Sequence, residues 1–156
     1  MKKILPLIAV PLVALGLVGT SASASPDKHQ GGFQLTGKVL GVSQIDLGDP
    51  GFSTGDQQII TMDVFQGAKR VGESHVLCTM VRVDKTTHAF NGLCDNVTSL
   101  PGGQISASGI VTSDDEEKRP FIQAITGGTG AYRNAHGQLT VSEAGPQPAT
   151  LTFDLA

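Results

Sequence analysis

Four glycines stand between two apolar runs in the stretch AITGGTGAYRNAHGQLTV, residues 124–141. A glycine-rich loop can bind phosphate through its backbone amides, but a Walker loop also needs a lysine, and this stretch contains none. The dinucleotide fingerprint fails as well, because Arg133 stands where the third glycine is required. Since glycine accepts positive φ and close backbone approach, the stretch instead predicts a tight corner between two strands. The glycines of this corner are Gly127, Gly128, Gly130 and Gly137.

Carboxylates held inside a cavity would offer general acid–base chemistry, because burial raises the pKa of a carboxyl group. Asp46, Asp63 and Glu73 are the candidates, and no catalytic role is assigned among them. Asp46 and Asp63 also fit a turn former or a solvated rim residue. Glu73 and His75 stand two residues apart, but no second histidine joins them. We therefore predict no metal site, and we expect no cofactor.

The two cysteines, Cys78 and Cys94, offer either a disulfide or a Cys–His catalytic pair. A free thiolate is disfavoured in an oxidising compartment, so the disulfide is preferred. On adjacent strands joined by a turn near residue 86, the two residues would face each other. Their Cα atoms would then lie about 4.5 Å apart, within the disulfide range. The closed loop of about 17 residues contributes roughly 3 kcal/mol in the chain-entropy model.

The N-terminus has the pattern of a secretory signal peptide. Lys2 and Lys3 precede an apolar run over residues 4–19, and Ala22-Ser23-Ala24 is a small-residue cleavage site. Two prolines interrupt a run that is short for a membrane anchor. We expect cleavage near Ala24, which divides the chain into a signal peptide at 1–24 and one secreted (extracellular) domain at 25–156.

The charge of the mature chain argues against nucleic-acid binding. Loss of two lysines lowers the basic count from 11 to 9 against 14 acids, so the formal net charge is −5. No basic stripe is present, and neither nucleic acid nor, after signal cleavage, a membrane is an expected partner.

Alternation of apolar and polar residues, rather than helical periodicity, runs through the mature chain. Turn residues divide it into about eight candidate strands. Eight short antiparallel strands in one domain predict an all-β barrel or sandwich, and a closed barrel removes exposed edges and can hold one small ligand. The candidate strands cover residues 33–39, 58–66, 75–83, 89–100, 104–113, 120–126, 137–143 and 150–155.

The glycine stretch resembles the signature of the allene oxide cyclase and dirigent superfamily. Asp46 to Pro50, Arg70-Val-Gly72 and Leu100 to Ser106 occur in the family's order, so the resemblance covers residues 32–156. It is closest to small secreted actinobacterial proteins called allene oxide cyclase barrel-like. The resemblance implies a single eight-stranded antiparallel, calycin-like β-barrel with an internal cavity, often assembled as a homotrimer.

The same resemblance implies that cyclase chemistry is incomplete in this chain. In plant allene oxide cyclases a glutamate and a small polar cage with an ordered water stabilise developing charge inside an apolar cavity. Without gaps, the glutamate position falls on a glycine, and most polar cage positions are lost. We therefore do not expect allene oxide cyclase activity itself. The cage positions fall on Gly41, Ser43, Asp49, Pro50, Met62 and Cys78, of which Pro50 and Cys78 match.

Two functions stay open, with a third as an alternative. The first is a secreted barrel that binds a small apolar molecule, and the second is a cyclase-like (isomerase) or dirigent-like protein that guides cyclisation or coupling of such a molecule. A titratable group inside the cavity would favour the second. The alternative is a non-catalytic, structural trimeric envelope protein with a filled barrel. The residues expected to line the cavity, with the inward face of each strand left open, are Phe33, Leu35, Val39, Pro50, Phe65, Leu77 and Phe121.

Overall fold

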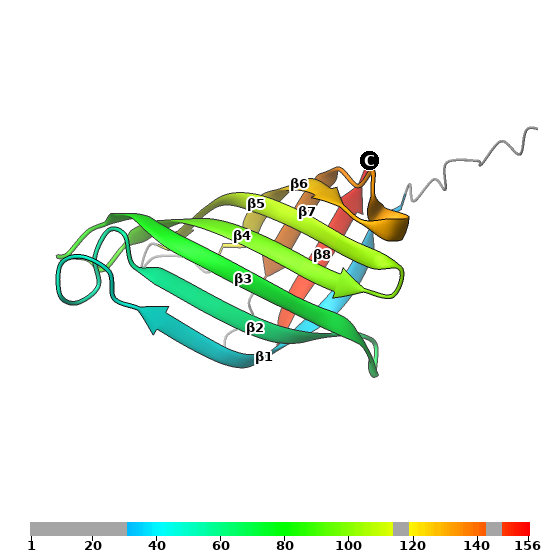
Figure 1. The fold of residues 1–156 in the computed structure, drawn as a ribbon, viewed down its shortest axis with the longest axis horizontal. Helices are drawn as coiled ribbons and strands as arrows, with labels where there is room; N and C mark the ends of the chain where they lie inside the picture. Colours follow the sequence, from blue (N-terminus) through cyan, green and yellow to red (C-terminus); the bar gives the residue numbers. More distant parts are fainter. Residues whose placement is uncertain (1–30, 114–118, 143–147) are drawn as a thin grey trace, which may run out of the picture.

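The computed structural model describes residues 31–113, 119–142 and 148–156. The predicted signal peptide therefore lies outside the described residues. Within them the chain is all-β and forms a closed eight-stranded antiparallel barrel in which each strand pairs with its sequence neighbours and β8 pairs with β1 (Figure 1). The predicted fold class is confirmed. The strands are β1 Phe33–Ile45, β2 Gln57–Gln66, β3 Lys69–Val83, β4 Phe90–Leu100, β5 Gly103–Ser113, β6 Phe121–Gly128, β7 Gly137–Ser142 and β8 Ala149–Leu155.

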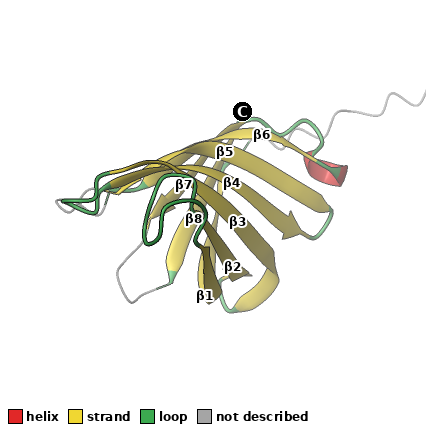
Figure 2. Ribbon diagram, turned by 60° about the vertical axis from the view of Figure 1, so that its left-hand side comes forward, coloured by secondary structure: helices red, strands yellow, loops and turns green. Residues whose placement is uncertain are grey.

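The hydrogen-bonded ring of eight strands is complete only toward one end of the barrel, because the strands differ in length. β2 to β5 are long, whereas β6, β7 and β8 are short (Figures 1 and 2). β1 pairs with β8 only from Phe33 to Gly37, although its pairing with β2 continues to Ile45. β5 likewise pairs with β6 only from Ile105 to Ser108. The strands β1 to β5 thus extend past β6 to β8, and we call this extension the open half and the opposite end the closed end.

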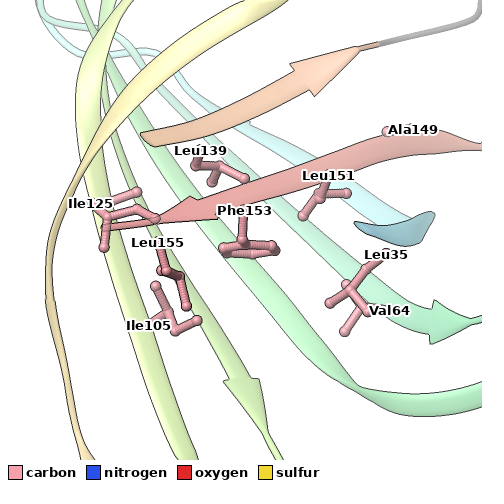
Figure 3. Close-up of a cluster of buried hydrophobic side chains, with 10 residues drawn as sticks. Leu35, Val64, Ile105, Ile125, Leu139, Ala149, Leu151, Phe153 and Leu155 are labelled. Atoms are coloured by element: carbon pink, nitrogen blue, oxygen red, sulfur yellow. The ribbon is translucent and has the colours of Figure 1, made fainter. Parts of the chain in front are cut away.

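An apolar core fills the closed end (Figure 3). Inward-facing side chains from six of the strands meet there, and Phe153 at the centre has no exposed surface and stacks on Phe33 with 4.8 Å between ring centroids. Burial of these side chains supplies the main stabilisation of the domain, since each fully buried large apolar side chain contributes about 1.5–3 kcal/mol. The buried members are Leu35, Val64, Ile105, Ala107, Ile125, Leu139, Ala149, Leu151, Phe153 and Leu155.

The glycine stretch forms the corner between β6 and β7 at the closed end. Gly130 opens a short 3₁₀ helix, η1 Gly130–Tyr132, with φ 58°, and Gly127 and Gly137 have φ 154° and 125°. A Cβ atom at Gly128 would lie 2.4 Å from the carbonyl oxygen of Tyr132 and 2.5 Å from that of Gln104. Close backbone packing, and not an open amide cradle, therefore explains the glycines of this stretch.

No helix within the described ranges has the length and apolar character to traverse a bilayer.

Candidate functional site

Strand pairing assigns the side chains of the open half to an inner and an outer face, because directly paired residues point to the same side. Met62 is buried and pairs with Val39 on β1 and Ser74 on β3, so all three face inward. Val39 is nevertheless 49% exposed, because β8 does not continue alongside this part of β1. The open half therefore presents an accessible inner face, which is the candidate site.

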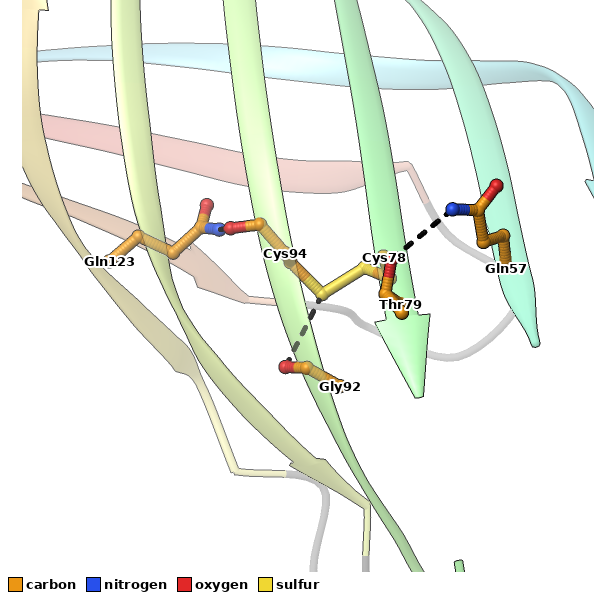
Figure 4. The surroundings of a disulfide bond; sticks show 6 residues. All are labelled: Gln57, Cys78, Thr79, Gly92, Cys94 and Gln123. Atoms are coloured by element: carbon orange, nitrogen blue, oxygen red, sulfur yellow. Dashed lines mark hydrogen bonds between the residues drawn. A yellow bond between two sulfur atoms is a disulfide. The ribbon is translucent and has the colours of Figure 1, made fainter. Parts of the chain in front are cut away.

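A disulfide lies on this inner face (Figure 4). Cys78 and Cys94 are directly paired residues of β3 and β4, with Cα atoms 4.0 Å apart, and both are buried. The predicted disulfide is confirmed, and it ties β3 to β4 in the middle of the site. The side chains packed around it are apolar, namely Val76, Met80, Val83, Phe90 and Val111.

Gln123 crosses the inner face beside the disulfide. Its Nε2 donates a hydrogen bond of 2.9 Å to the carbonyl oxygen of Cys94 (Figure 4), although β5 lies between β6 and β4. Gly109 of β5 makes this crossing possible, because a Cβ atom there would lie 3.4 Å from Gln123 Cγ and 3.1 Å from the carbonyl oxygen of Ile122. The result is a buried neutral amide held over a strand that has no side chain at that position.

Deeper inside lies a cluster of three buried polar side chains, which we call the polar cluster: Ser74, Asn96 and Thr98. Ser74 Oγ donates to Asn96 Oδ1 at 3.0 Å, and Thr98 Oγ1 lies 3.1 Å from both Ser74 Oγ and Asn96 Oδ1. Buried polar groups persist where they are hydrogen-bonded, so the cluster is stable inside an otherwise apolar wall. Asn96 also begins an Asn-x-Thr glycosylation pattern, but its burial inside the folded barrel makes it inaccessible for modification.

The β1–β2 loop, residues 46–56, folds over part of the site and leaves a hollow of about 150 Å³. Phe52 from the loop contacts Phe90 of β4 edge-to-face, with 5.5 Å between ring centroids. Gly55 N donates to the carbonyl of Met80 and Met80 N to the carbonyl of Asp56, both at 2.8 Å. The loop is therefore fastened to β3 and β4. The hollow is lined by Gln44, Ile45, Asp46, Gly51, Phe52, Asp56, Gln57, Gln58 and Met80.

The Asp56 carboxylate organises this loop. It accepts hydrogen bonds from the backbone amides of Leu47 at 2.8 Å and Ser53 at 2.7 Å, and from Ser53 Oγ at 3.3 Å. The Leu47 amide is the largest cause that lowers the pKa of Asp56, followed by the Ser53 amide. Because these donors bind the charged form, the carboxylate acts as a structural acceptor and is not poised as a general acid.

Loss of this carboxylate is expected to remove a pH-dependent part of the stability. A group whose pKa is lowered on folding stabilises the protein above its unfolded pKa of about 3.9, and that contribution disappears as the pH falls through the folded pKa. The stability difference between wild type and Asp56→Asn should be constant above about pH 5 and shrink below about pH 4. Urea unfolding of both proteins from pH 2.5 to 7 measures it. A difference that stays constant down to pH 2.5 would contradict the role given to Asp56.

Two of the three candidate carboxylates lie outside the barrel. Asp63 accepts a hydrogen bond from Arg70 Nε at 2.6 Å, and Glu73 lies 3.5 Å from Arg70 and 3.3 Å from His75 Nε2. Both belong to outer-face positions, because the alternating Met62 and Ser74 face inward. Asp46 lines the hollow and accepts a 3.1 Å hydrogen bond from Gly51 N. The structure therefore does not bring the three carboxylates together.

The residues expected to line the cavity separate into groups. Phe33 and Leu35 belong to the closed-end core. Val39 faces inward in the open half, and so does Phe121, which alternates with the buried Gln123. Pro50 is exposed in the β1–β2 loop.

The remaining two apolar candidates lie on the outer face. Phe65 follows the fully buried Val64, and Leu77 precedes the buried Cys78. Neither lines the interior, because strand residues alternate between faces. The sequence pattern gave the alternation but not which side of these strands faces inward.

A β-bulge moves the implied cage positions. Pairing skips Leu40, so Gly41 pairs with Thr61 on the outer face, while Val42 and Gln44 face inward. In the ungapped alignment the position of the cyclase glutamate falls on Gly41, which faces away from the site. If the alignment is shifted by one residue, this position falls on Val42, so neither alignment supplies a carboxylate.

The structure reveals inner-face residues that the sequence did not single out. Asn96, Thr98 and Gln123 form polar contacts inside the barrel, yet each reads as an ordinary strand or surface polar residue. The sequence did carry one signal for the first two. Cys94, Asn96 and Thr98 share one parity, so the disulfide, once placed inside, would have placed the other two inside as well.

Neutral side chains alone occupy the inner-facing strand positions of the open half, among the residues that the structure describes. The open half contains the amides Gln44 and Gln58 and the hydroxyl of Ser113. At its border with the closed end lie Asn96 and Gln123 with the hydroxyls of Ser74 and Thr98. Apolar side chains and the disulfide occupy most other positions. Such a surface can bind and orient a molecule by shape and hydrogen bonds, and it offers no proton donor or acceptor that titrates near neutral pH.

Comparisons with known proteins agree with this fold. Residues 38–152 match the family model described as the allene oxide cyclase barrel like domain. A solved pyocyanin demethylase is similar in structure with a TM-score of 0.68 and 31% identity, covering 80% of this chain and 99% of that one. AbnU, described as an exo-specific intermolecular Diels-Alderase, is similar with a TM-score of 0.57 and 16% identity, covering 80% and 98%. No protein with curated annotation matches the sequence.

Proposed function

Since the chain belongs to the allene oxide cyclase barrel like family, we propose that it binds a small apolar molecule on the inner face of its open half and holds that molecule in a defined orientation. The observation that carries this proposal is the accessible inner face itself, which combines apolar side chains, a rigid disulfide and a few neutral polar groups. Ligand sites have this composition in general: mostly apolar walls with a small number of placed polar groups.

The size of the hollow limits the ligand. A volume of about 150 Å³ under the β1–β2 loop suits one ring-sized group, since a cavity of about 150 Å³ binds benzene. A larger ligand would extend from the hollow along the open inner face, over Met80 and the disulfide. We therefore propose a ligand of one to three rings or an equivalent chain.

Guiding a reaction by orientation is the second part of the proposal. The strand positions of the open half hold no ionisable side chain in the described part of the chain. The two carboxylates that line the hollow, Asp46 and Asp56, both accept backbone hydrogen bonds within the β1–β2 loop, so acid–base catalysis of the allene oxide cyclase kind is not proposed. The 31% identical neighbour is named as a demethylase of pyocyanin, and the more distant one as a Diels-Alderase. Both names denote reactions of small organic molecules, which supports binding of such a molecule as the simpler function. A Diels–Alder reaction forms a ring from two partners, so the second name alone supports a cyclisation or coupling guide.

Self-association is proposed for the outer face. Five exposed apolar side chains cross it from β2 to β6, and two neighbouring pairs among them, Ile59 with Leu77 and Leu93 with Ile110, are directly opposite. Exposed apolar side chains gathered on one face are typical of an interface, which supports the homotrimer and also fits the alternative of a structural envelope protein. Light scattering after size exclusion tests it, and a monomer at 100 μM would contradict it. The strip consists of Ile59, Leu77, Leu93, Ile110 and Ile122.

Export is proposed from the N-terminal sequence and is supported by the disulfide, because disulfides persist in oxidising compartments. N-terminal sequencing of the protein from culture medium should give Ser25 as the first residue. Protein that stays inside the cells and still begins with Met1 would contradict export.

Binding is tested with the uncharged fluorescent probe N-phenyl-1-naphthylamine. Gly92 is the position to fill, because a Cβ atom there would lie 3.6 Å from Cys94 Sγ and Met80 Sδ without a clash, so a longer side chain would project over the disulfide. Wild type should bind the probe, and Gly92→Ala should bind nearly as well. Gly92→Leu should bind at least about tenfold more weakly, a loss of about 1.4 kcal/mol in binding free energy, because its side chain occupies the space of the probe. Leu93→Ala, on the outer face, is the matched control and should bind as wild type does. Equal binding by Gly92→Leu and wild type would contradict the proposal.

A further inference from the structure

The polar cluster contains a hydrogen-bond donor that the protein itself does not use. Asn96 Oδ1 accepts from Ser74 Oγ, and Thr98 Oγ1 is within hydrogen-bond distance of both. The amide nitrogen of Asn96 has no hydrogen-bond partner among the described residues, although the residue is only 2% exposed. A side-chain amide nitrogen carries two N–H donors, so this buried group has unused donor capacity.

The hydroxyl groups fix which end of the amide is unused. With Oδ1 toward Ser74 and Thr98, Thr98 donates to Ser74 and Ser74 donates to Asn96, so both hydroxyl hydrogens have an acceptor. With the amide reversed, Asn96 would donate to the hydroxyls and the hydroxyl hydrogen of Ser74 would lack an acceptor within the cluster. The network therefore selects the orientation that leaves the NH₂ group unpaired.

The unpaired nitrogen borders space that admits a water-sized probe. Every fully buried polar side-chain atom in the described ranges has a hydrogen-bond partner, so an atom without one must touch space that admits a water-sized probe. Asn96 faces the interior, where it pairs with the inward-facing Val76 on one side and the small Ala107 on the other. The next inward-facing residue of β4 toward the open half is Cys94, so the Asn96 amide lies next to the disulfide on the inner face.

We propose that the Asn96 amide is the specificity donor of this site, and that the bound molecule carries a carbonyl oxygen that accepts its hydrogen bond. This inference rests on the proposed binding function and adds the chemical class of the ligand: an apolar, ring-containing carbonyl compound, inserted with its oxygen toward the polar cluster. A neutral donor in an apolar wall selects a neutral acceptor, because a charged ligand group buried there would have no opposite charge beside it. Thr98 and Ser74 act as positioning residues that hold the amide in its donating orientation.

The test compares 1-indanone with indane, two bicyclic probes of nearly the same shape that differ in one carbonyl group. Each displaces N-phenyl-1-naphthylamine from the full mature chain, and the readout is the ratio of the two affinities. Removing the complete cluster by Ser74→Ala, Asn96→Leu and Thr98→Val leaves no orphaned partner, so the barrel should stay folded. The preference for 1-indanone should fall about fivefold in this triple variant, as expected for one neutral hydrogen bond, while indane binding should not change.

A double variant, Ser74→Ala with Thr98→Val, is the matched control because it retains Asn96. It should keep part of the preference and lie between wild type and the triple variant, because Asn96 can still donate although the hydroxyls no longer hold the amide in its donating orientation. Two results would overturn the assignment to Asn96: a triple variant that keeps the wild-type preference for 1-indanone, or a double variant that loses this preference as fully as the triple variant does. In either case, unchanged indane binding would still support the proposed function. Failure of both probes to displace the fluorophore from wild type would instead contradict the proposed function and this inference with it.

Discussion

Replacement of Phe153 by alanine is expected to lower the free energy of unfolding by about 3–5 kcal/mol, the range for truncating a fully buried phenylalanine. Phe153 has no exposed surface, pairs with Phe33 on β1 and Leu139 on β7, and stacks on the Phe33 ring. Truncation would open a cavity at the place where β8 closes the barrel. Such a loss is a large part of the 5–15 kcal/mol that stabilises an ordinary domain. Urea unfolding followed by circular dichroism measures it.

The control for Phe153→Ala is Ile122→Ala on the outer face. Ile122 is 56% exposed, so its truncation should change the unfolding free energy by no more than about 0.5 kcal/mol when the protein is monomeric. Equal effects of the two substitutions would show that the closed-end core is not where the stability lies.

Removal of the disulfide is the second large effect. The double variant Cys78→Ala with Cys94→Ala should be less stable by roughly 3 kcal/mol, because the 16-residue separation closes a loop that restricts the unfolded chain. Alanine also leaves the inner wall apolar, so no buried polar group is created. Guanidinium unfolding of the oxidised wild type and the double variant gives the difference.

The double variant also separates two roles of the disulfide. The bridge lies on the inner face and packs against Met80 and Phe90, so its loss should weaken binding of N-phenyl-1-naphthylamine at temperatures where the variant is fully folded. A variant as stable as wild type would contradict the entropic contribution. A variant that binds the probe as tightly as wild type would show that the ligand does not contact the disulfide.

The sequence predicted the architecture well because alternation and turn residues report strands directly. All eight strands were expected close to their observed positions, and the cysteine spacing correctly placed Cys78 opposite Cys94. The largest differences are in β1 and β3, each six residues longer than expected: β3 begins at Lys69, and β1 continues to Ile45 although Gly41 and a bulge interrupt its alternation. A bulge inserts one residue and reverses the parity beyond it, and no local sequence signal marks where that happens.

The candidate site was harder to predict, because strand parity gives two faces without saying which is inside. Leu77 and Cys78 are adjacent and both apolar, yet only Cys78 faces inward. The barrel closure decides this, and closure depends on contacts between β1 and β8, which are more than 100 residues apart. The polar cluster was missed for a related reason: Ser74 and Thr98 are recognisable as partners only after β3 and β4 are paired in register.

The two methionines of the described residues give the most direct test of the inner-face site. Met62 and Met80 are both buried inward-facing residues, and Met1, the only other methionine, belongs to the predicted signal peptide. In protein labelled with ¹³C-methyl methionine, titration with 1-indanone should shift both methyl resonances, assigned through Met62→Leu and Met80→Leu, and the shifts should saturate with the same affinity as displacement of the fluorophore. Saturable displacement with neither methyl resonance moving would place the ligand elsewhere and contradict the central claim.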